Sequence, residues 1–108
     1  MPYLILVYKQ ILNNIMTDNT SCIADFFKAL GDSTRIRILQ LLLSHEKLCV
    51  GFIAYKLGIT QSAVSQHLKV LKNSKIVEGK RSGSSIHYRI REDTLKEYGI
   101  ELAKIIKK

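Results

Sequence analysis

Apolar residues recur every three or four positions over much of this chain, which is the spacing of amphipathic helices. Two such helices adjoin at Gly31, which is suited to a helix C-cap, and either Asp32 or Ser33 can cap the second of them. The second helix ends at a polar break over residues 44–47. The residues expected on the apolar faces are Ile23, Phe26, Phe27 and Leu30 in the first helix and Ile36, Leu39 and Leu43 in the second.

Two further helices, over residues 50–57 and 61–73, are joined by a turn that begins at Gly58. Thr60 can cap the later helix, because its side-chain oxygen can accept from the free N–H groups of the first turn. The shared core of the pair is expected to contain Ile53, Leu57, Val64, Leu68 and Leu71. Two helices around a tight glycine turn form a helix-turn-helix unit.

The apolar period changes to two after this unit. Ile86, Tyr88 and Ile90 alternate with polar residues, which predicts a half-buried strand, and Ile76 and Val77 begin its partner. The connection contains Gly83, which can adopt the positive φ of a tight turn. A last amphipathic helix covers residues 93–106 and carries Leu95, Tyr98, Leu102 and Ile105 on one face.

These elements predict a mainly α fold with a small β-hairpin. Their order, α-α-α-α-β-β-α, is that of a winged helix-turn-helix, with an extra helix at the N-terminus. Glycine is sparse and the single proline is Pro2, so most of the chain is free to be helical.

The N-terminal segment begins with a continuous apolar run at residues 3–8, which is far shorter than the ~20 residues that span a bilayer. No basic region precedes the run and no small-residue cleavage site follows it, so a signal peptide is not expected. As a helix, the segment places Leu4, Tyr8, Ile11, Leu12 and Ile15 on one face, which favours packing in the core or in a dimer.

Two alternatives stay open for this segment. A helix lying on a membrane surface is disfavoured because only Lys9 supplies charge. The native chain could instead start at Met16, since the polar residues 17–20 make an ordinary N-terminus, and otherwise indicate a linker or a helix start.

The charge distribution points to a polyanionic partner. The 108 residues carry a net charge of +8, and residues 61–92 hold seven Lys or Arg against two Asp or Glu. Such a concentration is typical of a surface that binds nucleic acid or an anionic membrane. The length fits one domain, and two cysteines make no disulfide framework, which favours a cytoplasmic protein.

The polar positions of the second helix-turn-helix helix suit the major groove of DNA, where a helix fits and side chains contact base edges. We expect base or phosphate contacts from Thr60, Gln61, Ser62, Ser65, Gln66 and Lys69. The tip of the hairpin is expected to contact the DNA backbone or minor groove through Lys80, Arg81, Ser82 and Ser84. Lys72 and Lys75 would add phosphate contacts.

Sequence-specific regulation has several competing interpretations. The polar helix face could be merely solvated, but the glycine turn before it and the basic hairpin after it argue for binding. A non-specific, architectural DNA-binding protein is the alternative function. An enzyme is not expected, because the sequence has no nucleophile elbow, phosphate loop, HExxH motif or credible acid pair.

Two motifs give the chain a family resemblance. Leu30, Asp32, Thr34, Arg35, Ile38 and Leu39 form one, and residues 65–71 (SQHLKVL) form the other. At this spacing, residues 23–90 resemble the ArsR/SmtB family of bacterial and archaeal repressors. The resemblance implies a homodimer, paired through its first and last helices, that binds an operator with dyad symmetry and releases it when an effector binds. It also places His67 on the recognition helix, either touching phosphate or packing the helix.

The residue patterns and this resemblance together predict the organisation of the chain. Residues 1–19 are an N-terminal extension, helical and dimer-packing; residues 20–92 are the winged helix-turn-helix DNA-binding domain; and residues 93–108 are a C-terminal dimerisation helix. The partners expected are double-stranded DNA and a second copy of the chain, not a membrane.

The residues with which the family binds its effector are incomplete in this sequence. The family's thiol sensor is a Cys-x-Cys pair at the start of the third helix, but Cys49 is followed at that spacing by Gly51. Cys22 is a weak candidate for a second ligand, so a metal or metalloid site, a thiol redox pair and an inert cysteine all stay open. The family's zinc site on the last helix needs histidines that are missing among Asp93, Glu97 and Glu101. No cofactor is assigned.

Overall fold

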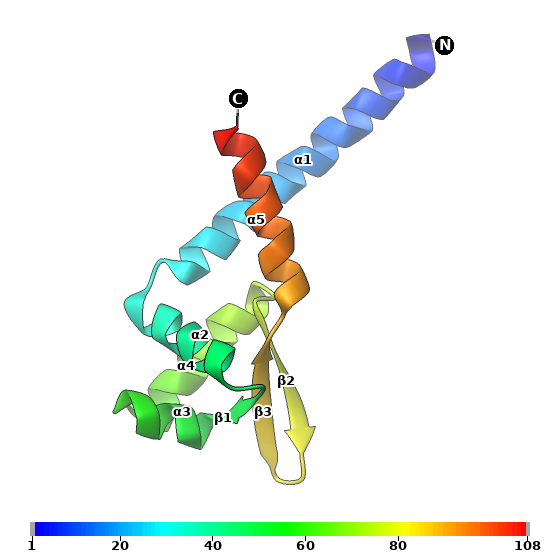
Figure 1. Ribbon diagram of the computed structural model, residues 1–108. Helices are drawn as coiled ribbons and strands as arrows, with labels where there is room; N and C mark the ends of the chain where they lie inside the picture. Colours follow the sequence, from blue (N-terminus) through cyan, green and yellow to red (C-terminus); the bar gives the residue numbers. More distant parts are fainter. Residues whose placement is uncertain (1, 108) are drawn as a thin grey trace.

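The computed structural model describes the backbone of residues 2–107 and the side chains of residues 4–7 and 20–107. Its elements, drawn in Figure 1, are α1 (Pro2–Leu30), α2 (Ser33–Ser44), β1 (Leu48–Cys49), α3 (Val50–Leu57), α4 (Gln61–Asn73), β2 (Val77–Ser82), β3 (Ser85–Ile90) and α5 (Glu92–Ile106). The helix-turn-helix, the hairpin and the closing helix follow in the predicted order. The winged helix-turn-helix fold is therefore confirmed.

The N-terminal region differs from the prediction, because α1 is one continuous helix of 29 residues. The extra N-terminal helix is therefore not a separate element, and the linker or helix start expected at residues 17–20 was wrong. Those polar residues include neither proline nor glycine, so they lower helix propensity without breaking the helix. The boundary predicted between residues 19 and 20 falls inside α1 and stays a prediction. Of the apolar face expected here, Leu4 is exposed, and the side chains of Tyr8, Ile11, Leu12 and Ile15 lie outside the described residues.

The core lies where α2, α3 and α4 meet the sheet. Its most completely buried side chains are Ile38, Ile53, Val64, Leu68, Leu71, Ile76 and Val77. The inner face predicted for α2 was partly wrong, since Ile36 and Leu43 are 37% and 68% exposed. Ile38 and Leu42 are buried beside Leu39 in their place, so the contact face is rotated around the helix.

The sheet has three antiparallel strands in the order β1-β3-β2, whereas the sequence predicted only the hairpin of β2 and β3. The additional strand pairs Leu48 with Tyr88 and Cys49 with His87. A strand of two residues is too short to show a period, which is why it was missed. Gly79 faces Tyr88 across the hairpin, where an added Cβ would come within 2.9 Å of the ring.

The first and last helices lie away from the helix-turn-helix. In Figure 1, α1 runs past α5 and projects from the body, and both ends of the chain lie at the top of the view. The two helices touch through Phe26 and Tyr98, whose rings stack. Within the described residues, no helix is long and apolar enough to cross a membrane.

Candidate nucleic-acid interface

The turn between α3 and α4 has the predicted local chemistry. Gly58 is left-handed, with φ 69° and ψ 32°, and its N–H donates to the Ala54 carbonyl over 2.9 Å. The Thr60 hydroxyl then accepts from the Ala63 N–H at 3.1 Å, which caps α4. These contacts fix where α4 begins and satisfy backbone groups that the two helix ends leave free.

The outer face of α4 carries the residues predicted to bind DNA. Val64, Leu68 and Leu71 are buried against the core, and most of the polar positions between them are exposed. The exposed polar residues of this face are Gln61, Ser62, Ser65, Gln66 and Lys69, and the cap residue Thr60 is exposed as well. Their availability is consistent with binding, and their individual contacts with DNA stay predictions.

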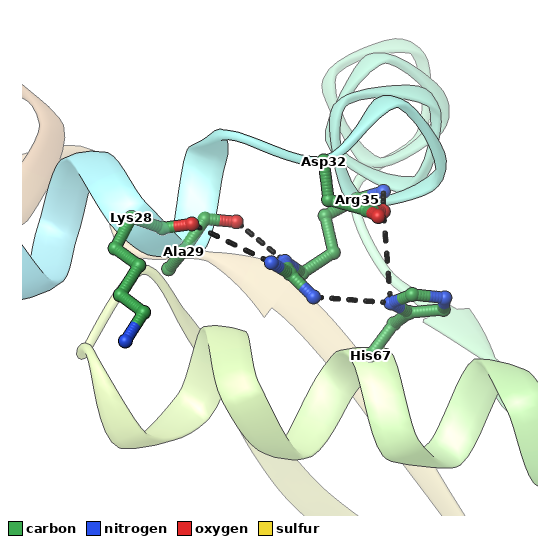
Figure 2. Close-up of polar contacts among 5 residues, drawn as sticks. All are labelled: Lys28, Ala29, Asp32, Arg35 and His67. Carbon is green, nitrogen blue, oxygen red and sulfur yellow. Dashed lines mark hydrogen bonds and ion pairs between the residues drawn. The ribbon is translucent and has the colours of Figure 1, made fainter.

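His67 differs from its neighbours, because it turns toward the start of α2. Its Nδ1 lies 3.4 Å from Arg35 Nη1 and 3.8 Å from Asp32 Oδ2 (Figure 2). The side chain is only 24% exposed. Of the two roles implied for His67, this position favours packing the helix over touching phosphate.

Asp32 is held in its charged form at the start of α2. Its carboxylate accepts the Arg35 backbone N–H at 3.0 Å, as predicted for a cap at this position. This hydrogen bond, helped by the charges of Arg35 and His67, keeps the pKa of Asp32 below its ordinary value. A carboxylate at this end also interacts favourably with the helix dipole.

The hairpin of β2 and β3 forms the wing. Its tip contains Gly83 at φ 64°, as predicted for a tight turn. Lys80, Arg81, Ser82 and Ser84, the wing residues predicted to contact DNA, are all exposed. In Figure 1 this tip and the α3–α4 pair lie at the same end of the molecule, far from the chain ends.

A groove of about 320 Å³ runs beside the wing. Its lining adds residues that the sequence did not single out for binding: Glu46, Lys47, His87 and Arg89, next to Lys80, Arg81 and Ser82. Lys47 reaches the groove because β1 joins the sheet beside β3. Since that strand was not predicted, no signal in the sequence would have placed Lys47 beside the wing.

Ion pairing separates the cations that are free to bind a polyanion from those that are not. Arg89 pairs with Glu78, and Arg91 pairs with Asp93 at 2.9 Å, which lowers the pKa of Asp93. Among the described residues, the exposed cations on α4, just after it, or on the wing strand β2 that have no ion pair are Lys69, Lys72, Lys75, Lys80 and Arg81, and Lys47 beside the wing is exposed without one as well.

The two cysteines lie in different parts of the chain. Cys22 is exposed on α1 beside Tyr98, whose pKa is raised by burial and further by the neighbouring Cys22 thiol. Cys49 is half-buried and pairs with His87 across the sheet. Within the described residues no three His, Cys, Asp or Glu side chains are grouped as metal ligands. Because the chain has only two cysteines, a site of three thiolates would need a thiolate from a second copy.

The position where the family has its second sensing cysteine is adjacent to α4. A Cβ added at Gly51 would lie 3.6 Å from the side-chain Nε2 of Gln61. A side chain at this position would therefore border the start of α4.

A tight helix-turn-helix with an open polar face, followed by a basic wing, defines a winged helix-turn-helix transcriptional regulator. Residues 32–78 match the family described as bacterial regulatory protein, arsR family. The chain belongs to the ArsR family, as its two motifs indicated.

Individual relatives agree with this assignment. The chain is 40% identical over 74 residues to an uncharacterised HTH-type transcriptional regulator of Methanocaldococcus jannaschii, covering 68% of this chain and 83% of the relative. It is 30% identical over 86 residues to a transcriptional repressor SmtB homologue of Synechocystis, covering 79% of this chain and 64% of that protein. It is also similar to the homodimeric winged helix-turn-helix DNA-binding domain of a possible ArsR-family regulator from Mycobacterium bovis, with a TM-score of 0.70, 28% identity and 84% of each chain covered.

Proposed function

We propose that this protein is a homodimeric repressor that binds an operator with dyad symmetry, one α4 in each half-site. The observation that carries the proposal is the outer face of α4, where exposed polar side chains are flanked by cations without ion pairs. Gln61, Ser62, Ser65 and Gln66 would contact base edges, and Lys69 and the wing would contact the backbone.

Dimerisation is supported by apolar side chains that one chain leaves exposed. On α5 these include Ile100, Ile105 and Ile106, which are 58%, 61% and 72% exposed. Leu4, Ile5 and Leu6 on α1 are similarly exposed. Because a second copy would cover such a surface, and the similar M. bovis domain is homodimeric, we assign α1 and α5 to the dimer interface. The two copies of α4 would then contact half-sites about one turn of DNA apart, roughly 34 Å.

We also propose that an effector controls DNA binding. The two cysteines restrict which effectors the protein could bind. A metal or metalloid bound by three thiolates would need Cys22 or Cys49 from both protomers, because each chain has only two cysteines. A thiol redox change is the other candidate. We further infer that the protein acts in the cytoplasm and catalyses no reaction, since it belongs to a family of regulators.

The test is a footprint on the DNA upstream of the protein's own gene, followed by competition at matched salt. Operator affinity should exceed affinity for random DNA by about 10³ or more. Random DNA that displaces the operator equally well would overturn the repressor proposal in favour of an architectural protein. Repeating the footprint with zinc, cadmium, arsenite and an oxidant, on the wild type and on Cys22→Ser and Cys49→Ser, tests the effector separately.

A further inference from the structure

Arg35 joins three helices at one point. Its Nε donates to the Ala29 carbonyl at 2.5 Å and its Nη2 to the Lys28 carbonyl at 3.4 Å, both in the last turn of α1. The Ala29 carbonyl has no donor within its own helix, so the guanidinium takes the place of one, while the Lys28 carbonyl also accepts from the Gly31 N–H at 3.1 Å. Its Nη1 is left for His67 of α4 (Figure 2).

The third contact depends on the proton at His67. When Nδ1 is unprotonated, it accepts from Arg35 Nη1. When the ring is protonated, Nδ1 becomes a donor, so Arg35 repels the imidazolium and the Asp32 carboxylate, 3.8 Å away, attracts it. The same ring atom therefore has two partners, and its proton selects between them.

The charges around His67 come from two elements. Asp32 and Arg35 face it from α2, and α1 acts through its carbonyls, while the Lys28 side chain points away from the imidazole in Figure 2. His67 directly follows Gln66 on α4. A change in the contacts of His67 would therefore shift the face of α4 that is predicted to contact bases. On the other side, Arg35 holds the end of α1, the helix assigned to the dimer interface.

We propose that Arg35 is a positioning residue that ties the recognition helix to the end of α1 through unprotonated His67, and that protonation of His67 transfers the contact to Asp32 and weakens operator recognition. This inference rests on the proposed function. The contact would make operator discrimination pH-sensitive, because the proton on Nδ1 selects between the two partners.

The experiment measures the ratio of operator to random-DNA affinity at about pH 8 and about pH 6. We expect the wild-type ratio to fall about tenfold on acidification, the loss of one hydrogen bond to a charged group. Using a ratio cancels the general gain in DNA affinity as the protein becomes more positive. His67→Asn keeps an acceptor near the position of Nδ1 and does not titrate, so its ratio should stay high at both pH values.

Two control variants, His45→Asn and Arg37→Lys, separate positioning from general stability. His45→Asn removes a different, exposed histidine and should retain the wild-type pH profile. Arg35→Lys keeps the charge but loses the several N–H donors of the guanidinium, so its ratio of operator to random-DNA affinity should be low at both pH values. Arg37→Lys, at an exposed position of α2, should behave as wild type. In NMR titrations, the amides of Ala29 and Gln66 should shift with the midpoint of the His67 ring.

A His67→Asn protein with an undiminished pH profile would overturn the inference, as would a wild-type ratio that does not change with pH. In both cases the repressor proposal would stand, because specific binding would remain. Equal affinity for operator and random DNA at every pH would overturn the two together.

Discussion

The Phe26 ring of α1 stacks on the Tyr98 ring of α5, with centroids 4.4 Å apart and an interplanar angle of 29°. Phe26 is 4% exposed and belongs to the core, so this pair is one of the contacts that join the core to the first and last helices. Both helices are assigned to the dimer interface. The angle between α1 and α5, which this pair helps to set, would therefore also affect how the two copies of α4 are placed in the proposed dimer.

Replacing Phe26 with Ala should therefore destabilise the protein. Loss of a buried ring and its stacking partner is expected to lower the free energy of unfolding by about 3 kcal/mol. Urea unfolding at a fixed protein concentration measures this, with Tyr55→Ala as the control, because Tyr55 is 81% exposed. Similar losses in the two variants would show that the Phe26–Tyr98 pair is not a principal packing contact.

The glycine at the helix-turn-helix turn should tolerate no side chain without cost. Gly58 has φ 69°, so Gly58→Ala is expected to destabilise the fold by about 1 kcal/mol, although nothing would touch the new Cβ. Gly99→Ala is the matched control, since Gly99 lies inside α5 with open space around it, and there alanine should stabilise by about 0.5–1 kcal/mol. Thermal unfolding of the two variants should show shifts of opposite sign. Equal signs would contradict this account of the turn.

Local signals explain what could be predicted from the sequence. Gly58 and Thr60 act on their own neighbours in the chain, so the turn and the cap of α4 were predictable. The wing was predictable because the spacing of apolar residues changes from that of a helix to the alternation of a strand. Strand β1 was missed because pairing with β3, which is distant in sequence, is what makes those two residues a strand.

The candidate site was predictable only where it depends on helix periodicity. The exposed face of α4 follows from the spacing of Val64, Leu68 and Leu71. The contact between Arg35 and His67 joins residues 32 positions apart, and only the packing of α2 on α4 brings them together. Helix α2 has apolar residues on several faces, so its sequence alone does not determine which face is buried. Packing buries Ile38 and Leu42 instead of the predicted Ile36 and Leu43.

Acid should remove a specific part of the stability at Asp32. Because its pKa is lowered on folding, the charged carboxylate stabilises the fold above the ordinary value of 3.8, and this contribution is lost as the pH falls through the lowered value. Asp32→Asn keeps a helix cap but has no carboxyl to titrate. The wild type should thus be more stable than Asp32→Asn at about pH 5, and the difference should shrink toward about pH 3. Urea unfolding at each pH measures this difference, and a constant value would contradict the assignment.

The glutamines of α4 should control sequence preference. If Gln61 or Gln66 bonds a base edge, its replacement by Ala should reduce discrimination at one base position by about 1–3 kcal/mol. Binding to a set of operators with single base changes measures this, and Lys69→Gln is the contrasting variant, because a lost phosphate contact should weaken all sequences alike. A variant whose preference is unchanged at every position would remove that glutamine from base reading.

The wing should act through charge. Arg81 is exposed and has no ion pair among the described residues, so Arg81→Gln should weaken binding to all sequences and reduce the slope of log affinity against log salt by about one unit. Lys96→Gln makes the same change in net charge on an exposed position of α5, away from the wing. If charge acted only through the overall field, the two variants would change the slope alike. A phosphate contact at the wing requires the slope to change with Arg81 and to stay near the wild-type value with Lys96.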